Sequence, residues 1–162
     1  MWDKLITLLS ELLELCQALL ELSKQKREFL IAGKAQNLEA VTRQEEMLIL
    51  QIGKLEGKRE KILHEIASAY NLNIQGLTLS QVRQLAADEV ADKLTEIEQL
   101  FSQITNELVP LNQLNTQLIQ QSLNFVNYNI NLLAQTQTGP TYASKGSAGQ
   151  SQPSRTFLDT KV

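Results

Sequence analysis

Apolar residues recur with a helical period along the first 70 positions. Leucines spaced three or four apart from Leu5 predict a helix from about Asp3 to Ala32, with Asp3 as its N-cap. Lys26 and Phe29 continue this register, and Gly33 is suited to end the helix because glycine readily adopts the left-handed conformation. A second apolar line runs beside the first. The apolar face is therefore wider than a dimeric coiled-coil seam and predicts packing in a bundle.

The next periodic stretch predicts a second helix from about Asn37 to Tyr70. Only Glu45 and Arg59 interrupt its apolar register. Together with Glu46 and Glu60 they are expected to form a solvated face with charge pairs about one turn apart. Two long helices joined by so short a link form an antiparallel hairpin.

A loop over residues 71–77 separates the hairpin from two further helices. Thr78 and Gln81 match a capping box that opens a short helix, which ends near Ala87. The last helix is expected to begin near Asp88 and to keep its apolar register through Leu132. Pro110 lies inside this register and is expected to bend the helix rather than divide it.

The pattern ends at residue 135, where a segment rich in Gly, Ser, Thr and Gln begins. Such a segment buries too little apolar surface to order itself. The sequence thus predicts a helical domain over residues 1–134 and a disordered, flexible tail over residues 135–162. The predicted fold is all-α, an antiparallel bundle of three long helices with one short connecting helix, in which a long hairpin is joined by a Pro-kinked C-terminal helix.

The second half of the last helix has a polar side without charge. Residues 111–133, LNQLNTQLIQQSLNFVNYNINLL, consist of apolar residues, amides and hydroxyls, and no charged residue occurs between Glu107 and Lys145. At 1.5 Å per residue the last helix measures about 70 Å and the first about 45 Å. Unless Pro110 folds the end back, its final turns extend past the hairpin with a bare apolar face, which calls for a covering partner.

Two hypotheses explain this face. Asn115, Ser122 and Asn129 recur at one heptad position, as in a self-association seam where an amide fixes the register. Alternatively, the face binds amphipathic helices of other proteins, because uncharged amides cost less to desolvate than ions and impose no charge pattern on the partner. The candidate client-binding residues are Leu111, Leu114, Asn115, Leu118, Ile119, Ser122, Leu123, Phe125, Val126, Asn129, Ile130 and Leu133.

Composition excludes several other functions. A net charge of −3 and a pI near 5.2 argue against nucleic-acid binding. Cys16 and His64 are the only residues of their types, so no metal-ligand spacing exists, and no phosphate-loop or nucleophile-elbow motif occurs. We therefore expect no enzyme activity, no cofactor and no metal. Neither a signal peptide nor a stretch apolar enough to span a membrane is found, so a cytoplasmic location is expected.

Several segments also resemble one family. The segment QIGKLEGKREKILHEIASAYNL, followed by GLTLSQV and the charge-free stretch, resembles the FlgN-type flagellar export chaperones over residues 1 to about 134. The resemblance implies a chaperone of the flagellar type III export system that holds hook-associated (hook–filament junction) proteins, prevents their premature assembly and delivers them to the export gate. It also implies that Leu111–Leu133 engages the client. The tail, which ends in RTFLDTKV, departs from this pattern, and a self-assembling coiled-coil adaptor that forms a homo-oligomer is the alternative.

Overall fold

The structure, a computed structural model, describes residues 1–72 and 78–137. Four helices make up this part of the chain: α1 (Trp2–Ala32), α2 (Ala35–Ala69), α3 (Leu79–Gln84) and α4 (Asp88–Gln137). No strand occurs among these residues, and the all-α prediction is confirmed. Most of the predicted 71–77 loop, and the predicted tail from residue 138 onward, lie outside the described residues.

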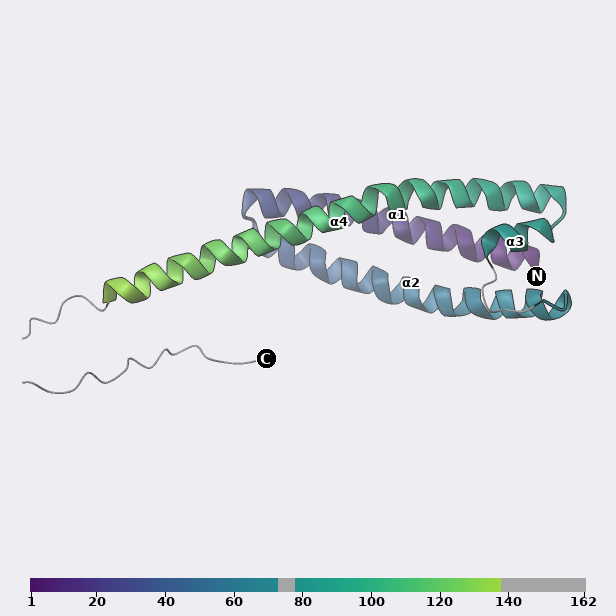
Figure 1. Cartoon of the computed structure of the whole chain (residues 1–162), viewed down its shortest axis with the longest axis horizontal. Coiled ribbons are helices and arrows are strands. Elements are labelled where there is room, and N and C mark those ends of the chain that lie inside the picture. The colour runs from purple at the N-terminus through teal and green to yellow at the C-terminus, as the bar shows by residue number, and fades with distance from the viewer. Residues whose placement is uncertain (73–77, 138–162) are drawn as a thin grey trace, which may run out of the picture. The chain divides into compact units, whose positions relative to one another are not determined.

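Internal contacts divide the chain into two compact units, Met1–Phe125 and Val126–Val162. The first unit contains α1, α2, α3 and most of α4. Within it α1 and α2 run in opposite directions as the predicted hairpin, and α4 runs in the same direction as α1 (Figure 1). The described part of the second unit is the end of α4, a single helical segment.

The ends of the helices follow the local sequence in most places. Gly33 ends α1 in the left-handed conformation, with φ 66°, and the N–H groups of Gly33 and Lys34 bond to carbonyls of the last turn of α1. The predicted N-cap at Asp3 is wrong. The helix already begins at Trp2, and Asp3 lies in its first turn, where a carboxylate still favours the positive end of the helix dipole.

The capping box before α3 is confirmed. The backbone N–H of Gln81 donates to the Thr78 hydroxyl, and the backbone N–H of Thr78 donates to the Gln81 side chain at 2.9 Å. Although α3 has only six residues, its Val82 is fully buried. The capping box therefore fixes the start of an element that closes one end of the bundle core.

That core lies in the first unit and combines all four helices. Its buried members are Leu5, Leu8, Leu9 and Leu12 of α1, Ile66 of α2, Val82 of α3, and Leu94 and Ile97 of α4. The helix α4 then continues without a break through Pro110, so the prediction of one helix across the proline is confirmed. The part of α4 beyond the proline carries the candidate site.

Candidate functional site

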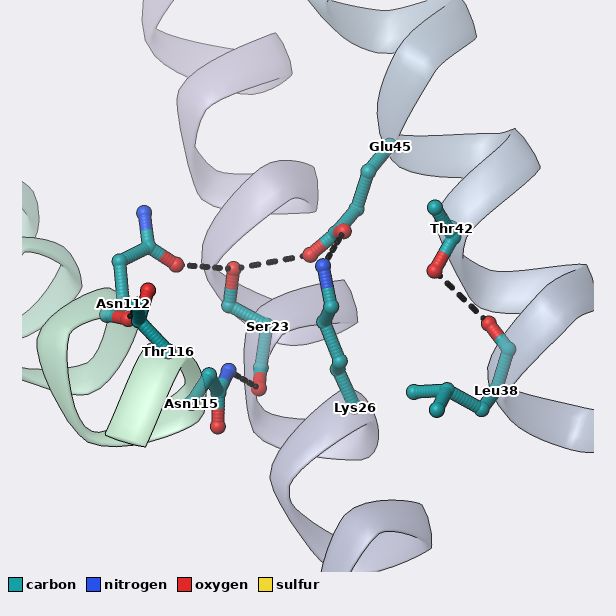
Figure 2. Close-up of polar contacts among 8 residues, drawn as sticks. All are labelled: Ser23, Lys26, Leu38, Thr42, Glu45, Asn112, Asn115 and Thr116. Atoms are coloured by element: carbon teal, nitrogen blue, oxygen red, sulfur yellow. Dashed lines mark hydrogen bonds and ion pairs between the residues drawn. The ribbon is translucent and has the colours of Figure 1, made fainter. Parts of the chain in front are cut away.

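A group of polar side chains joins α1, α2 and α4 in the first unit (Figure 2). We call it the Ser23 cluster. Its five residues are Ser23 and Lys26 of α1, Glu45 of α2, and Asn112 and Asn115 of α4. Because Asn112 and Asn115 lie two and five residues beyond Pro110, the cluster fixes the position at which the uncharged stretch of α4 begins.

The shortest contact in the Ser23 cluster is an ion pair. Lys26 Nζ lies 2.6 Å from Glu45 Oε2, and Glu45 is only 7% exposed. The expectation that Glu45 belongs to a solvated face is therefore wrong. Removing a carboxylate from water is unfavourable unless attraction and hydrogen bonds compensate, and both Lys26 and the Ser23 hydroxyl approach its two oxygens.

Ser23 connects the ion pair to α4. Its Oγ lies 3.2 Å from Glu45 Oε1 and 3.1 Å from the Asn112 side-chain oxygen. One hydroxyl carries one proton, so it can donate to only one of these two acceptors. The two ends of an amide differ only by their hydrogen bonds. If the oxygen and nitrogen of the Asn112 amide exchange places, its NH₂ group donates to the Ser23 hydroxyl. The hydroxyl then donates to Glu45, and both contacts are satisfied.

Asn115 fastens α4 to the backbone of α1. Its Nδ2 donates to the carbonyl oxygen of Ser23 at 2.9 Å, and the residue is 3% exposed. This bond fixes the amide orientation and leaves Oδ1 buried with no partner from the described residues. A cleft of about 220 Å³ beside it is lined by Ser23, Lys26 and Asn115 among others.

The candidate residues of the first unit divide into three groups by exposure. Leu111 and Asn115 are buried within the bundle, so neither is on an accessible surface. Leu118 and Ile119 are half-buried, and Leu114, Ser122, Leu123 and Phe125 are exposed. The exposed fractions of Leu123 and Phe125 reach 52% and 69%. The predicted apolar surface therefore begins after the Ser23 cluster, apart from Leu114.

Ser122 and Asn129 are not in the buried position of Asn115. The Ser122 hydroxyl donates to the Leu118 carbonyl of the same helix at 2.9 Å and is exposed. In the second unit, Val126, Ile130 and Leu133 are exposed and Asn129 is half-buried. The heptad position shared by Asn115, Ser122 and Asn129 thus lies in two environments. Its first member fixes register within the chain, and its later members lie on the exposed part of α4.

Sequence reasoning missed four members of the Ser23 cluster, namely Ser23, Lys26, Glu45 and Asn112. A signal was present for two of them, because Lys26 and Glu45 both occupy positions that the apolar register assigns to the core. Two opposite charges in the core registers of adjoining helices indicate a buried pair. Ser23 and Asn112 carried no comparable signal.

The described residues offer little for catalysis or metal binding. They contain no group of three or more His, Cys, Asp or Glu side chains that could hold a metal ion. His64 is exposed on α2. Burial and, to a lesser degree, the Glu56 carboxylate raise the pKa of the half-buried Cys16 thiol, which favours its protonated form. Within residues 1–72 and 78–137 no helix has the length and apolarity needed to cross a membrane.

The chain is similar to one protein family and to one curated bacterial protein. A family model described as "FlgN protein" matches residues 1–150, which include all four helices and the whole uncharged stretch. An "Uncharacterized protein YvyG" of Bacillus subtilis (strain 168) is 27% identical over 139 residues, which cover 86% of this chain and 84% of that protein. No solved structure matches the chain.

Proposed function

Because the chain belongs to the FlgN family, we propose that it is a flagellar export chaperone for hook-associated (hook–filament junction) proteins. The family is one of chaperones that bind flagellar proteins rather than one of enzymes. In this proposal the chain binds its client in the cytoplasm, prevents the client from assembling prematurely, and delivers it to the type III export gate.

One observation supports this proposal above the others: α4 carries an exposed apolar surface without charged residues. We call this surface the α4 strip. It consists of Leu114, Leu118, Ile119, Ser122, Leu123 and Phe125 in the first unit, and Val126, Asn129, Ile130 and Leu133 in the second. Leu111 and Asn115 are left out because they are buried.

The chemistry of the α4 strip suits an amphipathic helix of a client. Such helices bind through apolar residues spaced three and four apart, and the strip offers the same spacing. The amides and hydroxyls beside it bond polar groups of the client without demanding a particular charge. A client segment that is disordered when free can fold against the strip, at a cost in ordering that keeps its affinity moderate.

The proposal is tested by replacing two exposed apolar residues of the strip, Leu123→Asp and Val126→Asp, in the full chain. Co-purification and titration with hook-associated junction proteins should show binding weakened about 100-fold or more. An unpaired carboxylate buried in an apolar interface costs several kcal/mol, and each 1.4 kcal/mol corresponds to a factor of ten. Helicity, measured by circular dichroism, should not change, because both positions are exposed.

A matched control introduces the same two charges on the other side of α4. Gln117 and Asn124 are exposed and lie on the polar side of the helix, so Gln117→Asp with Asn124→Asp should leave client binding intact. Equal binding by both double variants would exclude the strip as the client site. Failure of the unaltered chain to bind any junction protein, with a stoichiometric oligomer that Leu123→Asp and Val126→Asp disrupt, would instead support the self-assembling adaptor.

A further inference from the structure

The outward side of α2 carries two large apolar residues that the bundle does not cover. Met47 is 62% exposed and Leu50 is 67% exposed, whereas the core-facing Val41 and Ile66 of the same helix are buried. Successive helical residues are about 100° apart, so Met47 and Leu50 share one side with Gly53 and Gly57, opposite the core-facing line. The outward side of a bundle helix is normally polar, and these residues depart from that pattern.

The two glycines on this side are not needed by the packing of the chain itself. A Cβ added at Gly53 or Gly57 would meet no atom within 4 Å, and each glycine costs the helix about 1 kcal/mol relative to alanine. Their effect is to leave room above the helix backbone. A second helix can use that room if its own large side chains lie opposite the glycines.

We propose that this face binds a second copy of the chain, with the two α2 helices antiparallel around a twofold axis at Leu50. A residue that lies a given number of positions before Leu50 then faces the residue that lies the same number of positions after Leu50 in the second copy. Leu50 faces Leu50 of the second copy, Met47 faces Gly53, and Arg43 faces Gly57. The two largest side chains before Leu50 on this side thus meet the two positions that have no side chain.

The charges on the same side fit this arrangement. Glu46 faces Lys54 of the second copy, and Glu39 faces Lys61. All four residues are exposed, and the twofold axis repeats each pair, which gives four pairs of opposite charge. In a parallel arrangement the same residues would face their own copies, carboxylate against carboxylate. Exposed pairs contribute little energy, but they select the antiparallel direction and the register.

The size of the face predicts the strength of the dimer. The paired residues extend from Glu39 to Lys61, about 33 Å of helix, and the apolar part consists mainly of Met47 and Leu50 from each copy. The area that one helix buries against another over this length is smaller than a standard interface of about 1,600 Å². The dimer should therefore be weak and depend on concentration. Its residues are separate from the α4 strip, so the proposal does not depend on the client-binding proposal.

Sedimentation of the full chain between about 1 µM and 1 mM, the range expected for small interfaces, tests the dimer. The unaltered chain should change from monomer to dimer within this range. Leu50→Asp should raise the dissociation constant about tenfold or more, because the axis places two carboxylates face to face. Circular dichroism should stay the same, since the Leu50 side chain is outside the core.

Charge reversal gives a second readout that loss of folding cannot imitate. Glu46→Lys alone should weaken the dimer by placing lysine against Lys54, and the combination of Glu46→Lys with Lys54→Glu should restore it. Leu123→Asp with Val126→Asp should leave the dimer unchanged. A chain that stays monomeric throughout, a dimer that Leu50→Asp does not weaken, or a double charge reversal that does not restore association would each overturn the proposal.

Discussion

Glu45 shows how a single residue outside the apolar pattern determines local packing. Its carboxylate approaches Lys26 at 2.6 Å and the Ser23 hydroxyl at 3.2 Å, and all three side chains lie at the meeting point of α1 and α2. Removing the carboxylate leaves the Lys26 ammonium, which is 19% exposed, without its partner. The unfavourable burial of the two charged groups is therefore compensated only while both partners are present.

We predict that Glu45→Ala lowers the free energy of unfolding by about 1–3 kcal/mol, the usual cost of leaving a buried polar group unpaired. Urea unfolding followed by circular dichroism measures it. Glu46→Ala, at an exposed neighbour, should change stability by no more than about 0.5 kcal/mol. Replacing both partners, Lys26→Met with Glu45→Leu, should recover most of the loss. Equal effects of Glu45→Ala and Glu46→Ala would mean that the pair is not buried in solution.

The ion pair was only half predictable. Lys26 and Glu45 each stand out in the sequence as charged residues in apolar registers. Their pairing depends on how far α1 and α2 are shifted along each other, and a helical period does not determine that shift. The same applies to Asn115. The sequence placed it in a self-association seam or a client-binding face, whereas its side chain bonds the backbone carbonyl of Ser23 in the same chain, an acceptor that no side-chain pattern reveals.

At the scale of the helices, one chemical change should have opposite effects at two glycines. Gly33 has φ 66°, where a Cβ is strained even though nothing crowds it, so Gly33→Ala should destabilise the fold by about 1 kcal/mol. Gly53 lies inside α2 in open space, so Gly53→Ala should stabilise it by about 1 kcal/mol. Both are read from urea midpoints at low micromolar concentration, where the proposed dimer is dissociated.

The sign of each change is the informative result. Destabilisation by Gly53→Ala under these conditions would show that the glycine serves the folded monomer after all, contrary to the open space above it. At high concentration the same variant should dimerise less well, because the added methyl group crowds Met47 of the second copy.

The helices were the most predictable part of the molecule, because their start and stop signals are local. Gly33 and the Thr78 capping box act through hydrogen bonds to residues a few positions away, and both are found as predicted. The start of α1 was misplaced because aspartate is stabilising at an N-cap and also within the first turn. The end of α4 at Gln137 lies three residues beyond the predicted boundary, since helix ends fray and have no sharp chemical signal there.

For the whole molecule, the sequence located the exposed surface by what it lacks. No charged residue occurs from Leu108 to Ser144, and the exposed apolar residues from Leu123 to Leu133 lie within that stretch. The sequence could not show that Leu111 and Asn115 are buried, because that depends on contacts with α1 far away along the chain. Beyond Asn115 every residue of the α4 strip is half-buried or exposed, and this decrease in burial should be visible in the dynamics of the free protein.

Hydrogen exchange of the full chain, with and without client, measures that change along one helix. Amides without tertiary cover open locally at low cost, so residues 118–134 should exchange faster than residues 91–105, where Leu94 and Ile97 are buried in the core. Client binding should slow exchange in residues 118–134 and leave residues 91–105 unchanged. With Leu123→Asp and Val126→Asp the client should produce no slowing. Equal protection of both segments in the free protein would show that the strip is already covered, and the chaperone would then have to bind its client elsewhere.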